Sequence, residues 1–332
     1  MPLPPLTWSS FWASWGFRPV WDLLILVALV CYLLGLRAAA RRGTLSVHPA
    51  RVASFVAGLV LLAFTLNSAI DVYAMAVFWD HMIEHLLLIM VVPALLVVGL
   101  PLTVWRDALT GRARTRLESV LESRPVAVLT HPIVGLGIYS LVIVATHLTS
   151  FMDQMAMHPW LMYVEQVLYL VAGYLFLLPL LGREPIRWRL PYLFRIALIL
   201  VGMTPDTVVG IVLMQTQSDP FPMMFSMHPA WAPAPLHDLE IGGAMMWAFG
   251  DMLMMFFGFG VIAAFIADPH RDRMLGPWLE RVRAGTLSAN VVKGLDDSAS
   301  PGFAEDADVD EDEEVLAAYN RMLGRLDSHR SG

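Results

Sequence analysis

The sequence is short of charged residues, of lysine and of cysteine. Only 15% of its 332 residues are charged, whereas a soluble domain usually carries about 25%. Cys31 is the single cysteine, which excludes a disulfide within the chain and a CxxC metal or redox motif. Lys293 is the single lysine among 22 basic residues. The composition excludes an ordinary soluble domain, and no nucleic-acid partner is expected.

Long hydrophobic runs, in contrast, are abundant. Seven runs of roughly 17–25 residues are each long enough to cross the hydrocarbon layer of a bilayer. They are Val20–Leu36, Val52–Ile70, Met82–Leu100, Pro132–Ser150, Val164–Leu181, Phe194–Gln215 and Glu240–Ala267. The sequence therefore predicts an all-α fold in the lipid bilayer, with a seven-transmembrane-helix bundle over residues 1–270.

Arginines are confined to alternate loops. They follow the first, third, fifth and seventh runs, while the loops at about 71–80, 151–163 and 216–238 contain no Lys or Arg. Because basic residues mark cytoplasmic loops, the pattern predicts the N-terminus outside and the C-terminus in the cytoplasm. We expect a multi-pass protein of the bacterial plasma membrane.

Residues 271–332 are predicted to form a cytoplasmic tail. The run Glu305–Glu314 holds eight carboxylates. After it, apolar residues recur at helical spacing: Val315, Leu316, Tyr319, Met322, Leu323 and Leu326. This predicts a short amphipathic helix that could dock on a partner or on the inner face of the protein. A frayed tail with an incidental stripe explains the pattern equally well.

Histidine and methionine gather on the predicted outer side. Six of the ten histidines and twelve of the twenty methionines fall in the outer loops or outer helix turns. Their local density is the stronger signal, as in the segment 152–162. Imidazole and thioether together suit copper, especially Cu(I). Methionine also fills apolar space without any such role.

The segment 81–85 is the strongest local signal. His81 and His85 share one helix face because they are four residues apart, and Met82 and Glu84 lie at the margins of that face. Such polar groups are costly in a membrane span unless they are used or paired. The pattern predicts a metal site that other helices complete. H-x-x-E-H is also an inverted zinc-protease signature, and an interhelical hydrogen-bond cluster is the structural alternative.

Five further residues are candidate ligands or neighbours of the metal. His147 lies near the outer end of the fourth run, at the depth of the histidine pair. Asp206 is a carboxylate near the middle of the sixth run, where an acid is functional by default unless it is protonated or bonds the backbone that the preceding proline opens. His237 and Asp238 open the seventh run, where an acid also suits the helix dipole. Glu165 stands at the start of the fifth.

Four segments together resemble the integral-membrane CtaG family of bacterial cytochrome c oxidase assembly factors, actinobacterial type. They are HMIEHLLLIMVVPALLVVGLP (81–101), HPIVGLGIYSLVIVATHLTSFMDQM (131–155), the start of the fifth run with AGYLFLLPLLG, and HDLEIGGAMMW (237–247). The resemblance implies copper delivery, with cytochrome c oxidase subunits or a respiratory supercomplex as partners. It also implies that His81, His85, His147 and Asp238 are the polar positions of the family.

The sequence departs from the family pattern at the fifth span. Many members begin this span with a second His-x-x-Glu-His, and the matching residues here are Met162, Glu165 and Gln166. Glu165 is kept and both histidines are lost. This implies a reduced metal site, or a scaffold role without metal.

The residues are compatible with three functions. The first is an assembly factor, not an enzyme, that holds or passes copper on the outer face. The second is a membrane enzyme: a zinc protease with Glu84 as base, or a haem redox protein in which His81 or His85 is paired with His147. The third is a copper or proton transporter, for which Asp206 is the main argument, although no inverted repeat is evident.

Overall fold

The computed structural model describes residues 3–268. The predicted tail, with its acidic run and amphipathic helix, lies outside these residues. The helix bundle belongs to one compact unit, Met1–Ile262. Every regular element within residues 3–268 is helical, so the all-α prediction is confirmed for the part of the chain that the structure covers.

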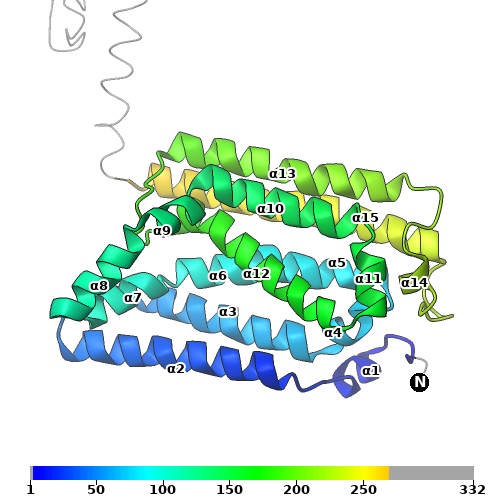
Figure 1. Ribbon diagram of the computed structural model, residues 1–332, viewed down its shortest axis with the longest axis horizontal. Helices are drawn as coiled ribbons and strands as arrows, with labels where there is room; N and C mark the ends of the chain where they lie inside the picture. Colours follow the sequence, from blue (N-terminus) through cyan, green and yellow to red (C-terminus); the bar gives the residue numbers. More distant parts are fainter. Residues whose placement is uncertain (1–2, 269–332) are drawn as a thin grey trace, which may run out of the picture. The chain divides into compact units, whose positions relative to one another are not determined.

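Six helical stretches are long and apolar enough to cross a membrane, and a bent pair provides a seventh if it is counted as one span. The six are α2 (Pro19–Arg41), α3 (Pro49–Asn67), the stretch Phe78–Ala108, α12 (Trp160–Leu181), α13 (Tyr192–Met214) and α15 (Pro235–Ile266). The pair is α10 (Pro132–His147) and α11 (Phe151–Met157), which meet at 65°. The chain is therefore a multi-pass membrane protein. Figure 1 shows the spans side by side and running alternately in opposite directions.

The stretch Phe78–Ala108 combines four segments, and short helices cap the ends of the bundle. The four segments are α5 (Phe78–Leu86), the π-helical turn η1 (Leu87–Val91), α6 (Val92–Val98) and α7 (Pro101–Ala108). The short helices are α1 (Trp8–Ala13), α4 (Ala69–Ala74), α8 (Gly111–Leu121), α9 (Arg124–Leu129) and α14 (Pro222–Phe225). In Figure 1, α8 and α9 lie at one end, and α4, α11 and α14 lie at the other.

The predicted limits of all seven spans differ from the helices, and the outer ends of the second, third and fourth spans illustrate the reasons. The second run was expected to end at Ile70, but α3 ends at Asn67 because Ser68 starts α4 and accepts a hydrogen bond from the Ile70 amide. The third starts at Phe78 rather than Met82. The fourth ends at His147 rather than Ser150 because the chain bends into α11. All three ends lie at the outer ends of the predicted spans, where turns are polar and periodicity is weak.

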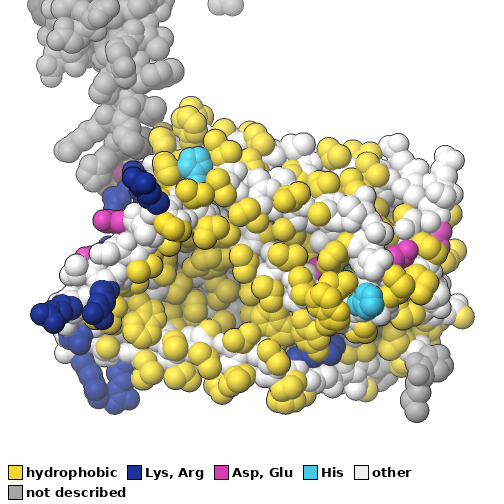
Figure 2. All heavy atoms as spheres, viewed as in Figure 1, with side chains coloured by type: hydrophobic (Ala, Val, Ile, Leu, Met, Phe, Trp, Pro, Cys, Tyr) yellow, Lys and Arg dark blue, Asp and Glu magenta, His cyan; other side chains and the backbone are white. Residues whose placement is uncertain are grey.

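The α5–α6 stretch and α12 form the centre of the bundle. In the apolar 18-residue segment of each span, 61% of the residues are buried inside the protein for Phe78–Ala108 and 56% for α12, against 17% for α2 and for α15. Hydrophobic side chains cover most of the middle of the face in Figure 2, whereas most of the arginines in view lie at the α8 end. This distribution fits helices that expose apolar side chains to lipid.

The contact between α12 and η1 depends on Gly173. A Cβ placed on this residue would lie 1.9 Å from the carbonyl oxygen of Ile89. Only glycine therefore allows the two backbones to approach so closely, as is common between membrane helices. The contact fixes α12 against the helix that carries His81 and His85.

At the opposite end of the bundle, Glu184 caps α7 from the loop after α12. Its carboxylate accepts hydrogen bonds from the Leu102 amide at 3.0 Å, the Thr103 amide at 2.8 Å and the Thr103 hydroxyl at 2.7 Å. Burial raises the pKa of the Glu184 carboxyl, and these donors partly offset the rise. The contact ties the α6–α7 turn to the end of α12.

Candidate metal site

His81 and His85 of α5 meet Glu165 of α12 in the interior of the bundle. The Nε2 atoms of the two histidines lie 3.8 and 3.5 Å from Glu165 Oε1, and one ligand atom from each residue lies within 4.8 Å of the others. The exposed fractions of the three side chains are only 1%, 7% and 3%. The residues face one another because the histidines are one helical turn apart and α12 crosses α5 closely.

The nitrogens of this group have no hydrogen-bond partners in the part of the chain that the structure describes. Within residues 3–268, Nδ1 and Nε2 of both histidines and Oε1 of Glu165 are buried and unbonded. Their mutual distances are too long for hydrogen bonds, and buried polar atoms are normally paired. Two atoms that each lie 2.0–2.1 Å from a tetrahedral metal are about 3.4 Å apart. The donor atoms therefore fit a shared cation better than they fit one another.

His147 of α10 stands beside the group. Its ring centroid is 4.8 Å from that of His85, and its Nδ1 is 2.9 Å from the Ile143 carbonyl oxygen. A carbonyl can only accept, so this bond assigns the proton to Nδ1 and leaves Nε2 with a free lone pair. That Nε2 is buried and has no partner among the described residues. The free Nε2 makes His147 a candidate for a further imidazole ligand, beside the three residues whose ligand atoms converge.

Tyr169 connects the histidines to α12 and is a residue that sequence reasoning missed. Its ring lies 4.1 Å from that of His85, and its hydroxyl is 2.5 Å from that of Thr146, which in turn lies 3.0 Å from His147 Nδ1. A buried tyrosine hydroxyl needs a partner, which was the available signal. These contacts hold the two rings in place.

Glu84 points into a separate polar network. Gln166 donates both of its amide hydrogens at 2.8 Å, one to Glu84 and one to Asp71, and accepts from the Trp21 indole at 2.9 Å. Arg18 forms an ion pair with Asp71. Burial raises the pKa of Asp71, and the Arg18 guanidinium opposes this rise. Gln166, expected only to be a poor ligand, joins three helices beside Glu165. Neither this role of Gln166 nor the participation of Asp71 was predicted from the sequence.

Asp238 positions the histidine pair from another helix. It accepts hydrogen bonds from the amides of Phe78 at 2.7 Å and Trp79 at 3.0 Å, and lies 3.1 Å from His228. Those amides are free donors in the first turn of α5, where a carboxylate acts as an N-cap. Asp238 therefore fixes the start of α5 one turn before His81.

The other candidate residues lie away from the ligand group. Asp206 accepts a 2.5 Å hydrogen bond from the Tyr139 hydroxyl, between α13 and α10. His237 is exposed and lies 3.1 Å from Glu240. Met82 is buried against Gly242 of α15. The structure therefore brings His81, His85 and Glu165 together with His147 beside them, and gives Asp206, His237 and Met82 other neighbours.

Comparisons with known proteins identify one matching family model and several relatives. A protein-family model described as "Cytochrome c oxidase caa3 assembly factor" matches residues 30–268. The uncharacterized protein Mb0105 of Mycobacterium bovis is 28% identical over 99% of this chain and 47% of its own length, and protein MT0111 of Mycobacterium tuberculosis gives the same values. The uncharacterized protein ML1998 of Mycobacterium leprae is 28% identical over 82% of this chain and 42% of its own. The chain spans about half the length of these relatives or slightly less. No solved structure matches it.

Proposed function

The chain belongs to the cytochrome c oxidase caa3 assembly factor family, and from this premise we propose that it holds copper on the extracytoplasmic face and delivers it to cytochrome c oxidase. Copper is the cargo in this proposal rather than a resident cofactor. The family relates the protein to the oxidase, and the metal and its delivery are our inference.

The unpartnered donors of His81, His85 and Glu165 carry the proposal. Imidazole nitrogen is a good ligand for copper and also for zinc, and carboxylate can complete either set. His147 would add a third imidazole, because its free Nε2 is already oriented by the bond to Ile143. The ligands are buried, so cargo held there would be shielded from competing ligands in solution until the bundle opens.

The orientation is part of the proposal. The arginine pattern of the loops favours an outer N-terminus and a cytoplasmic C-terminal tail. The histidines lie in the first turns of α5, and the arginines of α8 follow the far end of the same stretch. With the arginines inside, the metal group lies in the outer half of the membrane.

The zinc-protease and haem alternatives receive less support. Glu84, the base that a protease would need, has its Oε1 bonded to Gln166 and is outside the ligand group. The rings of His85 and His147 are 4.8 Å apart at 89°, which leaves no room for a porphyrin between them. Both observations favour a site that holds a single ion.

Metal analysis of the purified protein tests the proposal. After loading with copper and desalting, we expect the wild type to retain copper in a fixed ratio and His81→Ala with His85→Ala to retain none. His237→Ala is the matched control, because this exposed histidine lies outside the group. Equal retention by the double variant would refute the site. Zinc retained in preference to copper would refute the choice of metal.

Cells test the delivery role. We expect deletion of the gene to lower cytochrome c oxidase activity at normal transcription of the oxidase subunits, with partial rescue by added copper. The double histidine variant at normal abundance should fail to complement. Full complementation by it would instead indicate a scaffold that needs no metal.

A further inference from the structure

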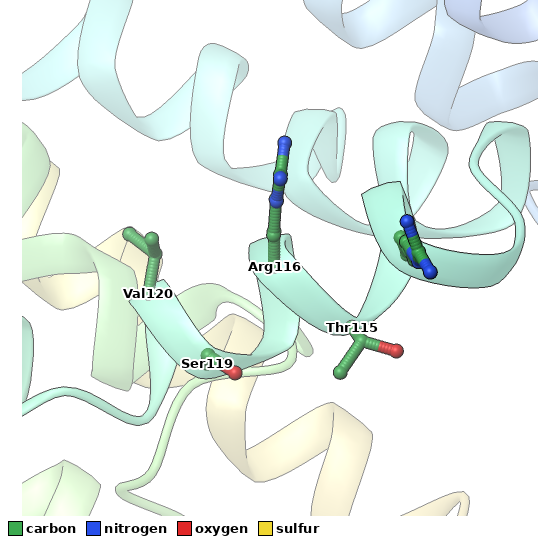
Figure 3. A pocket seen from close by; sticks show the side chains of 5 residues that line it. Thr115, Arg116, Ser119 and Val120 are labelled. Atoms are coloured by element: carbon green, nitrogen blue, oxygen red, sulfur yellow. The ribbon is translucent and has the colours of Figure 1, made fainter.

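One face of α8 carries two exposed arginines with two hydroxyls between and beside them. Arg112, Thr115, Arg116, Ser119 and Val120 line a shallow, open hollow on this helix. Their spacing of three and four residues groups them on adjoining faces of the helix. In Figure 3, Arg116 and Val120 project upward from α8, and Thr115 and Ser119 lie on its lower edge. All five are exposed. The face therefore presents a row of hydrogen-bond donors to its surroundings.

No acid within the described part of the chain forms an ion pair with the two arginines of this face. Arg114, on a neighbouring face of α8, forms an ion pair with Glu118 at 2.9 Å. Among residues 3–268, Arg112 and Arg116 have no carboxylate within 4.0 Å. Two guanidinium groups one helical turn apart favour the binding of an anion, and the geometry of guanidinium matches that of phosphate in particular.

The position of α8 places this face at a membrane boundary. The helix begins three residues after the span that ends at Ala108, and α9 leads directly into α10. It lies at the end of the bundle where basic side chains gather (Figures 1 and 2). Exposed apolar residues accompany the arginines, with Val120 57% and Val128 59% exposed. A segment with cationic and apolar side chains beside a span end suits the interface between headgroups and acyl chains.

We propose that this face of α8 binds the phosphate of an anionic phospholipid. Arg112 and Arg116 contact the phosphate oxygens, Thr115 and Ser119 donate to the same headgroup, and Val120 lies against the start of the acyl chains. An anionic headgroup is favoured over a zwitterionic one because the face carries no carboxylate to hold a choline or ethanolamine cation. The proposal is independent of the metal site.

Lipid retention by the purified protein tests the proposal. The wild type, Arg112→Gln with Arg116→Gln, and Arg114→Gln are each incubated in detergent with phosphatidylglycerol, phosphatidylcholine or inorganic phosphate, and bound molecules are counted by native mass spectrometry. We expect the wild type and Arg114→Gln to retain phosphatidylglycerol selectively. The double variant should bind it about tenfold to thirtyfold more weakly, given the usual contribution of two basic residues at an anionic surface.

Three outcomes would overturn the proposal. The first is equal retention of phosphatidylglycerol by the double variant and the wild type, and the second is an equal loss in Arg114→Gln, which would indicate a diffuse charge effect. The third is wild-type binding of phosphatidylcholine or inorganic phosphate as strong as that of phosphatidylglycerol.

Discussion

Replacement of Gly173 by alanine should separate the two helices that form the metal group. The added Cβ would lie 1.9 Å from the Ile89 carbonyl oxygen and 2.7 Å from the Ile89 carbonyl carbon. Both atoms belong to a backbone, which cannot turn aside as a flexible side chain can. To reach an ordinary contact distance, α12 and η1 must move apart by more than 1 Å.

The energetic balance is unfavourable in spite of alanine's helix propensity. Overpacking costs about 1–3 kcal/mol or more, and the change from glycine to alanine inside a helix returns about 1 kcal/mol. At Gly137 of α10, among the described residues, no atom outside the adjoining turns of the same helix lies within 4 Å of the added Cβ, so Gly137→Ala receives the propensity gain alone. Each variant adds one methyl group to the wild type. Gly173→Ala should lower the stability of the protein, and Gly137→Ala should raise it.

Thermal unfolding in detergent and copper retention measure the two consequences. We expect Gly173→Ala to unfold at least about 5 °C below Gly137→Ala. We also expect it to bind copper about tenfold more weakly, as when support around a metal site is removed, because Glu165 moves with α12. A Gly173→Ala variant as stable as Gly137→Ala would refute the backbone contact. Lost stability with unchanged copper affinity would refute the coupling between this contact and the site.

Two further variants test the caps. Asp238→Asn should weaken copper binding about tenfold with little loss of folded protein, because the charge that orients the Phe78 amide at the start of α5 is removed. Copper titration measures this affinity, and an unchanged affinity would contradict a positioning role for Asp238. Glu184→Gln should destabilise the fold by about 1–3 kcal/mol, since bonds to the Thr103 amide and hydroxyl lose their charged acceptor. The exposed Glu122→Gln is the control in denaturation measurements, and equal midpoints would contradict the cap.

Local patterns in the sequence predicted the parts of the site that lie on one helix. The spacing of His81 and His85 is a property of a single turn, so it could be recognised without knowing any neighbour. The lengths of the apolar runs predicted the spans for the same reason. The prediction of His147 needed only one further argument, namely that the third and fourth runs place this residue and the pair His81 and His85 at the same depth in the membrane.

Residues that act across the bundle could not be assigned in this way. Glu165 was expected beside the site as a possible ligand, but its proximity to His85 depends on how α12 crosses α5. From the sequence, Asp238 was expected to stabilise the dipole of its own helix. In the structure it caps a different helix, which starts 160 residues earlier. Gln166 reaches Asp71 across 95 residues. Such pairings depend on tertiary packing, which periodicity does not encode.

The π-helical turn η1 has a consequence for helical phase. A π turn holds one more residue than an α turn, and each residue of an α-helix corresponds to about 100° of rotation. Deleting one residue within Leu87–Val91 would therefore swing the imidazoles of α5 by roughly a quarter turn relative to α6. With the extra residue, α6 keeps its packing on α12 while His81 and His85 face Glu165. One helix thereby satisfies two angular demands that a regular α-helix could not meet together.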